Sequence, residues 1–192
     1  MPRQTKSEIN DEILDCAAGL FGRQGFARTS IQQVAEALNY SKAGLLHHYP
    51  SKKALYEAVL DKYESKARER IAELESLPAG LERDRRMIEG SIEQAFKWPG
   101  MIEFGHFMVR DGLSEEPRFV QLGLEVISSF GIDFDAPDLE RMTRAFSALA
   151  GISFSARIAK TMKMEREFRD HIRTAAMDAL GHGARRPVQK VS

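Results

Sequence analysis

Cysteine is almost absent from this chain, since Cys16 is the only one among 192 residues. A single cysteine cannot form an intrachain disulfide, which suits a protein made for a reducing compartment. Cys16 lies in an apolar helical stretch, where we expect a buried structural thiol. The alternative is a redox sensor, which requires an exposed thiol with a lowered pKa.

Long apolar runs are also missing. No segment approaches the roughly 18 apolar residues of a membrane span, and the N-terminal stretch MPRQTKSE lacks the apolar core of a signal peptide. We therefore expect a cytoplasmic protein with no membrane partner. Its 43% hydrophobic and 29% charged residues are typical of a soluble globular chain.

Neither sign of charge is in excess, because 28 basic residues balance 28 acidic ones. Overall charge therefore does not indicate a nucleic-acid partner, and only its local distribution is informative. The stretch from Asn39 to Lys53 contains no acidic residue but has three lysines and two histidines. A DNA duplex could approach this stretch without like-charge repulsion.

Signals for strands and for enzymes are absent as well. There is no alternating strand pattern, Asn-Gly hairpin or internal repeat, which predicts an all-α fold. There is no glycine-rich phosphate loop, nucleophile motif or metal-ligand cluster. Glu103 and His106 have helical spacing, but two ligands are too few for a metal site. We expect no enzymatic activity, cofactor or metal.

What is present is a run of helix signals between residues 30 and 49. Ser30 and Gln33 form a capping box, which predicts a helix over 30–38. Asn39 tolerates the left-handed conformation of a sharp turn, and Ser41 then caps a second helix over 42–49. Two short helices joined by a tight turn are typical of a helix-turn-helix DNA reader.

Further helices flank this pair. Thr5 and Glu8 form a capping box for a first helix that ends near Gly25. Pro50 stops the second short helix, and a long helix follows from about 52 to 74. Asp135 is the expected cap of the fourth of five later segments, which we predict at 81–97, 99–111, 115–130, 136–161 and 164–181.

The residues from Ile13 to Val59 resemble the N-terminal domain of the TetR (tetracycline-repressor-like) family of bacterial regulators. The resemblance is carried by ILDCAAGLFGRQGFARTSIQQVAEAL, SKAGLLHHYPSKKAL and YEAV. It implies a DNA-binding domain at 1–52, a ligand-binding and dimerisation helical domain at 53–181, and a tail at 182–192 that we expect to be disordered. Beyond residue 60 the chain is similar to the family only in helicity and length.

Two sets of residues are expected to contact DNA. Position on the second short helix points Lys42, Ala43, Gly44 and His47 at base edges and Leu45 into the core, while Gln32 can reach an adenine or a phosphate. The resemblance implies that the phosphate backbone is held by Thr29, Ser30, Ser41, His48 and Lys52. Leu46 and His48 stand where many family members have tyrosines, and Leu46 cannot donate a hydrogen bond.

The C-terminal half offers a dimer interface, because one helix-turn-helix gives little affinity and dimers reading two half-sites are usual. The expected interface residues, on the last two helices, are Ile152, Ala156, Ala159, Phe168, Ile172 and Ala176. The alternative is that these helices pack tightly within one chain.

An aromatic and methionine concentration in residues 96–134 could line a pocket for an apolar ligand. The expected lining is Trp98, Met101, Phe104, Phe107, Phe119 and Phe130; the alternative is ordinary core packing. The resemblance then implies a dimeric repressor released from an inverted-repeat DNA operator by a small hydrophobic or aromatic effector. A constitutive DNA-binding protein without effector, and a helical bundle that has lost sequence-specific DNA binding, are the alternatives.

Overall fold

The computed structural model describes residues 5–108 and 117–183, apart from the side chains of residues 117 and 118. Within these ranges the chain forms nine helices and no strand, as the all-α prediction requires. The helices are α1 (Lys6–Arg28), α2 (Ile31–Ala37), α3 (Lys42–His48), α4 (Lys52–Leu74), α5 (Leu81–Lys97), α6 (Pro99–Phe107), α7 (Pro117–Ser128), α8 (Leu139–Met162) and α9 (Glu165–Ala179).

The chain divides into two compact units, and neither is continuous in sequence. The first comprises the described residues of Met1–Ala72 and Lys97–Glu125, and the second those of Glu73–Phe96 and Val126–Ser192. This division by packing differs from the expected boundary between residues 52 and 53, because α6 and most of α7 pack with the N-terminal helices.

Local capping explains where the N-terminal helices begin. The Thr5 side chain accepts from the amide of Glu8, whose carboxylate accepts in turn from the Thr5 amide. Regular helix runs to Gly25, which has φ +78°, and one further turn extends α1 to Arg28. The expected end near Gly25 is therefore the position of a kink.

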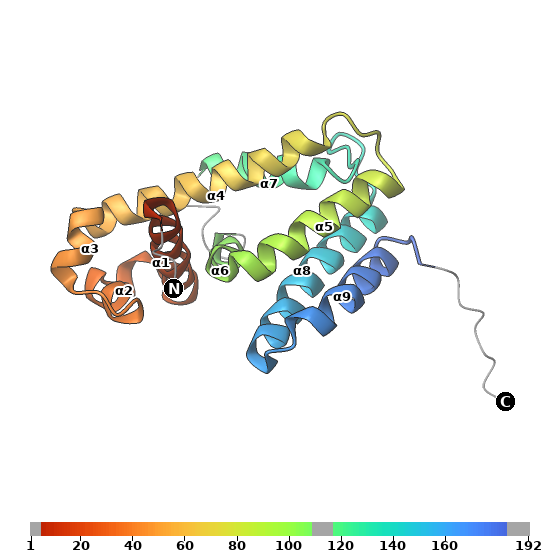
Figure 1. Ribbon diagram of the computed structural model, residues 1–192. Helices are drawn as coiled ribbons and strands as arrows, with labels where there is room; N and C mark the ends of the chain where they lie inside the picture. The colour runs from red at the N-terminus through yellow and green to blue at the C-terminus, as the bar shows by residue number, and fades with distance from the viewer. Residues whose placement is uncertain (1–4, 109–116, 184–192) are drawn as a thin grey trace. The chain divides into compact units, whose positions relative to one another are not determined.

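The first unit has a core built around α1 (Figure 1). Its fully buried side chains come from every helix from α1 to α4 and from α6: Ile13, Ala17, Phe21, Val34, Leu45, Leu55, Val59 and Phe104. α1 and α6 pack closely because glycines face each other's backbones. A Cβ on Gly22 would lie 2.7 Å from the carbonyl carbon of Glu103, and a Cβ on Gly100 would overlap the carbonyl oxygen of Asp15.

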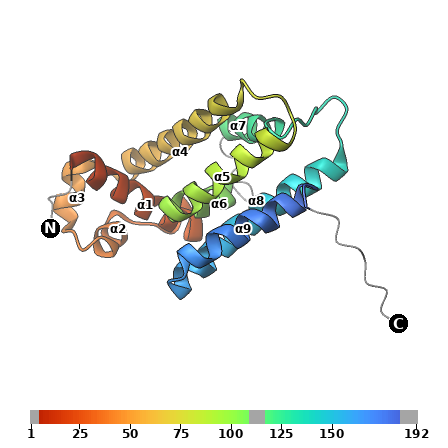
Figure 2. The ribbon, with the colours of Figure 1, turned by 45° about the vertical axis from the view of Figure 1, so that its right-hand side comes forward.

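The second unit contains most of α5 together with α8 and α9, and α8 and α9 lie side by side along their length (Figure 2). Asp84 is only 1% exposed and accepts hydrogen bonds from Arg141 and from His182 Nε2, the latter at 2.6 Å. Arg141 also donates to the carbonyl oxygens of Phe130 and Leu180. This buried network ties the start of α5 to both C-terminal helices.

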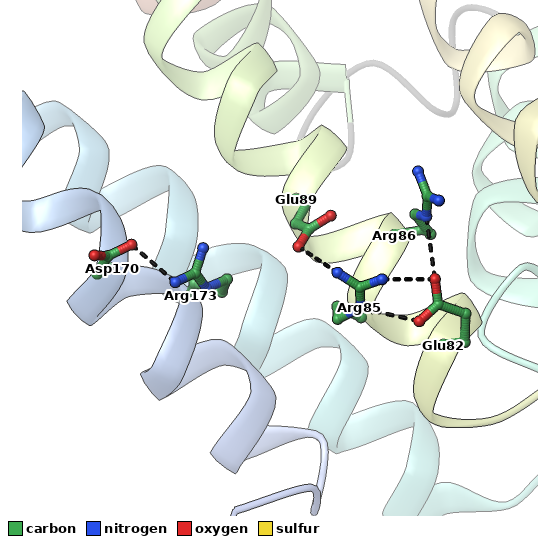
Figure 3. Close-up of polar contacts among 6 residues, drawn as sticks. All are labelled: Glu82, Arg85, Arg86, Glu89, Asp170 and Arg173. Carbon is green, nitrogen blue, oxygen red and sulfur yellow. Dashed lines mark hydrogen bonds and ion pairs between the residues drawn. The ribbon is translucent and has the colours of Figure 1, made fainter.

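Exposed ion pairs line the surfaces of α5 and α9 (Figure 3). Arg85 lies 2.7 Å from Glu82 and 3.1 Å from Glu89 within α5, and Arg173 lies 2.8 Å from Asp170 within α9. Such solvated pairs contribute little to stability compared with a buried one.

Two expectations about helix ends need correction. α8 begins at Leu139 with Asp138, not Asp135, as its cap, because the Asp138 side chain accepts from the amide of Arg141. His182 was expected to open a disordered tail, yet it is held by Asp84. The expected extension of the second segment to 111 and the start of the third at 115 lie outside the described residues.

Candidate nucleic-acid interface

α2, α3 and the turn between them have the geometry expected of a helix-turn-helix. Ser30 and Gln33 form both hydrogen bonds of the capping box. Asn39 adopts φ +56°, and the amide of Tyr40 donates to the carbonyl of Ala35 at 2.8 Å. The reversal is thus set by local hydrogen bonds and by a residue that tolerates the left-handed region.

α3 exposes one face and buries one residue. Lys42, Ala43, Gly44, His47 and His48 are all exposed, whereas Leu45 is 0% exposed in the core of the first unit. The sequence likewise predicted that Leu45 lies in the core and that the other residues named as DNA contacts on this helix face away from it. Leu46 is half-buried against the same core, so its lack of a hydrogen-bonding group is matched to an apolar environment.

The two capping serines remain suited to holding an anion. The hydroxyl oxygen of Ser30 accepts from the amide of Gln33, and that of Ser41 accepts from the amide of Gly44 at 3.0 Å. Each bond uses the oxygen as acceptor, which leaves the O–H free to donate to a phosphate. Both serines are exposed, at the N-terminal ends of α2 and α3.

Thr29 does not lie where a phosphate could reach its side chain. It is 2% exposed, and its hydroxyl donates to the carbonyl oxygen of Gly25 at 2.8 Å. This position contradicts the expected side-chain contact with the phosphate backbone. The hydroxyl instead donates to a carbonyl oxygen at the kink of α1, four residues back in the chain.

Lys52 has a structural contact that sequence reasoning missed. Its ammonium donates to the carbonyl oxygen of Phe26 at 2.9 Å and lies 4.2 Å from the centre of the Phe26 ring. A lysine at the C-terminal end of a helix is favourable because the last carbonyls carry partial negative charge. Lys52 therefore joins the start of α4 to the end of α1, and its expected phosphate contact stays a prediction.

Gln32 lies on the exposed face of α2, and its carboxamide nitrogen donates to Glu36 at 2.7 Å. One N–H and the carbonyl oxygen of the carboxamide remain available to a base or a phosphate. The pairing orients the Gln32 side chain along α2, toward Glu36.

Comparison with known proteins identifies this segment. Residues 13–59 match the model of the family described as "Bacterial regulatory proteins, tetR family". Over these residues, the chain is similar to TetR-family regulators. The matched range contains most of α1, all of α2 and α3, and the beginning of α4, so it coincides with the helix-turn-helix and the helices that support it.

Two curated transcriptional regulators match a segment of similar length. The chain is 39% identical over 49 residues to the HTH-type negative transcriptional regulator IcaR of the Staphylococcus aureus biofilm operon icaADBC, and 48% identical over 48 residues to the HTH-type transcriptional regulator RutR of Escherichia coli. The alignments cover 26% and 25% of this chain and 26% and 23% of those proteins. The chain thus matches only about a quarter of each relative's length.

Solved structures extend the likeness of fold to nearly the whole chain. A TetR-like transcriptional regulator from Rhodococcus sp. RHA1 has a TM-score of 0.51 and 21% identity, with 93% of this chain and 99% of that chain covered. The ketosteroid transcriptional regulator KstR2 of Mycobacterium tuberculosis has a TM-score of 0.54 and 16% identity, with 93% and 95% covered. At these identities the likeness concerns the fold alone.

The expected ligand-pocket residues are divided between the units. Trp98, Met101, Phe104 and Phe119 are buried in the core of the first unit, with Phe107 half-buried beside them, whereas Phe130 is buried in the second unit. The six residues therefore do not form one group within a unit. Their packing favours the core alternative, and the ligand cavity stays a prediction.

The expected dimer residues are almost all buried inside one chain. Ile152, Ala156, Ala159, Ile172 and Ala176 are at most 5% exposed, because they pack α8 against α9, and Phe168 is half-buried. The prediction that they form the subunit surface is wrong for the five buried residues. Small residues allow close packing, and here that packing is between neighbouring helices of the same chain.

The exposed apolar side chains of α8 lie on a different stripe. Phe146 is 50% exposed, Phe154 59%, Ile158 36% and Met162 54%. Steps of four residues, each turning about 40° further around the helix axis, place these side chains and exposed Ala150 along one ridge that winds gradually around α8. We call Phe146, Ala150, Phe154, Ile158 and Met162 the α8 stripe. The repeat at i, i+4 was the signal that could have found it in the sequence.

Two searches of the described ranges were negative. None of the helices in residues 5–108 and 117–183 combines the length and the apolar character needed to cross a bilayer. In the same part of the chain, no three His, Cys, Asp or Glu side chains are grouped as they would be around a metal ion.

Proposed function

We propose that the chain is a DNA-binding transcriptional regulator that acts as a dimeric repressor. The observation that carries the proposal is the exposed face of α3, which presents Lys42, Ala43, Gly44 and His47 with a capping serine at its start. An α-helix with its side chains is about 10–12 Å in diameter, and the major groove is about 12 Å wide. α3 can therefore enter the groove with its N-terminal residues against the base edges.

The surroundings of α3 favour a phosphate backbone on both sides of the groove. The hydroxyls of Ser30 and Ser41 and the side chain of His48 are exposed at the ends of the two short helices. No carboxylate lies between Asn39 and Lys53 to repel DNA. Backbone contacts position the helix, and the residues of α3 that reach base edges supply the sequence preference.

The α8 stripe supports a second copy of the chain as partner. Two phenylalanines and two further large apolar side chains that are each at least 36% exposed favour burial against another apolar surface. A two-fold axis through the stripe would pair it with itself, which is the isologous contact of most dimers. Two copies would then present two α3 helices to half-sites of an inverted repeat.

A small, largely apolar effector completes the proposed repressor. The support is the aromatic and methionine concentration on α6 and α7, together with two proteins of similar fold: KstR2 is a ketosteroid regulator, and a putative transcriptional regulator from Saccharomonospora viridis has a structure in complex with choline. An effector must bind the released state about 10⁴-fold more tightly than the DNA-bound state to convert one almost fully into the other. A constitutive repressor without effector is the second candidate, favoured by the dense packing of Phe104 and Met101.

Selection from random duplexes tests DNA binding. We expect an inverted repeat whose half-site centres are separated by about 34–36 Å or a multiple of it. Lys42→Glu should abolish selection, because it places a negative charge at the groove. Lys160→Glu is the matched control, since it makes the same charge change on an exposed residue of α8. Absence of any enriched sequence for the wild type would overturn the proposal.

Sedimentation at micromolar concentration tests the dimer. Phe154→Glu should give a monomer that retains weak binding to a half-site but loses tight binding to the inverted repeat. Phe134→Glu, which changes a 39% exposed phenylalanine outside the α8 stripe, should remain dimeric. A monomeric wild type, or a dimeric Phe154→Glu, would remove this part of the proposal.

The effector is tested by thermal shift against a panel of hydrophobic and aromatic compounds, followed by operator release. A ligand that raises the unfolding midpoint and lowers operator affinity supports regulated repression. If no compound in the panel has both effects and the protein still represses transcription, the constitutive alternative is favoured.

A further inference from the structure

α3 buries little of its own surface, although its side chains must be positioned accurately to contact base edges. It has seven residues, and Leu45 is the only one that is fully buried. Isolated helices of this length are unstable in water, so the packing of the ends decides where the helix lies. Its N-terminal end follows directly from the turn at Asn39, and its C-terminal end requires an anchor of its own.

Tyr49 provides that anchor. It is the residue after α3, with extended backbone, and its amide donates to the carbonyl oxygen of Leu45 at 2.9 Å. Its hydroxyl donates to Oδ1 of Asn10 on α1 at 2.5 Å, across 39 residues of sequence. Both side chains are half-buried, so water competes only partly for this bond.

The acceptor end of the bond is itself fixed. Asp11, the neighbour of Asn10, lies 2.7 Å from Lys62 Nζ on α4, which ties the same turn of α1 to a second helix. Burial raises the pKa of Tyr49, the bond to Asn10 opposes that rise, and the charge of Asp11 adds to it. The phenol therefore stays protonated at neutral pH and remains the donor.

We propose that Tyr49 and Asn10 form a positioning pair that sets the angle at which α3 enters the major groove, and with it the discrimination between operators. The inference rests on the proposed DNA-binding function. Leu45 fixes the rotation of α3 about its own axis, and the Tyr49 hydroxyl fixes the tilt of its C-terminal end. Neither Tyr49 nor Asn10 needs to touch DNA for this effect.

The expected consequence is a loss of discrimination rather than of general affinity. A side chain on α3 that is no longer aligned with its base edge loses part of its preference for the correct base pair, and we expect the affinity ratio to fall about tenfold. Phosphate contacts tolerate a small tilt, so the dependence of affinity on salt should keep its slope.

The test measures the affinity ratio between the selected operator and the same operator with one half-site base pair changed. Tyr49→Phe keeps the ring and removes the hydroxyl, and Asn10→Leu keeps the approximate volume of the side chain and removes the acceptor. Each should lower the ratio about tenfold with an unchanged salt slope, and the double variant should equal either single one. Asn10→Asp retains an acceptor oxygen and should restore the wild-type ratio.

Tyr63→Phe is the matched control, because it removes a tyrosine hydroxyl from the core of the same unit and should leave the ratio unchanged. Helical circular dichroism of each variant identifies a failure to fold, in which case the remaining partner variant decides. A selective wild type with an unchanged ratio in Tyr49→Phe and in Asn10→Leu overturns this inference alone. A uniform loss of affinity with a shallower salt slope overturns it as well, because Tyr49 would then be a phosphate ligand. A wild type that selects no DNA overturns the proposed function together with it.

Discussion

Gly22→Ala tests whether the close crossing of α1 and α6 stabilises the first unit. A Cβ at this position would lie 2.7 Å from the carbonyl carbon and oxygen of Glu103 and from the amide nitrogen of Phe104. Non-bonded carbon atoms prefer separations of about 3.5–4.0 Å, so the helices would have to move apart by about 1 Å. The clashing atoms belong to the backbone, which cannot rotate out of the way as a flexible side chain could.

The magnitude follows from three contributions. Overpacking of this kind costs about 1–3 kcal/mol. Separation of the helices also strains the bond of 2.9 Å from the amide of Met101 to Oδ1 of Asp15, which contributes about 1 kcal/mol. Alanine is favoured over glycine in a helix by about 1 kcal/mol, which offsets that loss. The variant should therefore be destabilised by about 1–3 kcal/mol, or about 2–4 °C in melting temperature for each kcal/mol.

Thermal and urea unfolding at one fixed protein concentration provide the measurement, since a dimer melts at a concentration-dependent temperature. Gly123→Ala on α7 is the control: nothing lies within 4 Å of its added Cβ, so helix propensity alone should stabilise it by about 0.5–1 kcal/mol. If Gly22→Ala were as stable as Gly123→Ala, the close approach of α1 and α6 would be refuted.

Three further predictions concern single groups. Asp84→Ala should cost about 3–5 kcal/mol in the free energy of unfolding because it leaves Arg141 without its buried carboxylate, whereas Glu82→Gln in the exposed pairs of Figure 3 should leave the urea midpoint unchanged. Cys16 should react slowly with a disulfide reagent at pH 8 in the native state, because burial raises the pKa of its thiol; rapid reaction would contradict this. The hydrogen bond from the Thr5 amide lowers the pKa of Glu8, so its capping contribution should be present at neutral pH and lost only as pH falls through that lowered pKa. An NMR titration of Glu8 with an ordinary carboxyl pKa would exclude the cap.

Sequence alone predicted the features that depend on neighbours in the chain. Capping boxes at Thr5 and Ser30 and the left-handed turn at Asn39 involve residues within three or four positions, so the sequence contains nearly all the interacting groups. The start of α8 was misplaced by three residues, because Asp135 and Asp138 are both chemically suitable caps and only the position of the helix distinguishes them.

Features that depend on distant segments were missed. Lys52 is a residue type suited to a phosphate contact, yet its ammonium donates to the carbonyl oxygen of Phe26, 26 residues earlier at the end of α1. In α8, both the small residues and the larger apolar ones recur at helical spacing. Which stripe is buried depends on the neighbouring helices: the small residues Ala156 and Ala159 are at most 2% exposed, whereas Phe154 is 59% exposed. Helical periodicity defines faces but does not say which neighbour each face meets.

The glycine crossing of α1 and α6 has a practical consequence for fragments and chimaeras of this protein. A truncation after residue 60 would retain α1, α2, α3 and part of α4 but remove α6, and so would uncover the side of α1 that holds Gly19, Gly22 and Asp15. Tyr56 would lose its edge-to-face contact with the ring of Phe104. Grafting these helices onto another body therefore requires that α6 be carried with them, although it lies some forty residues further along the chain.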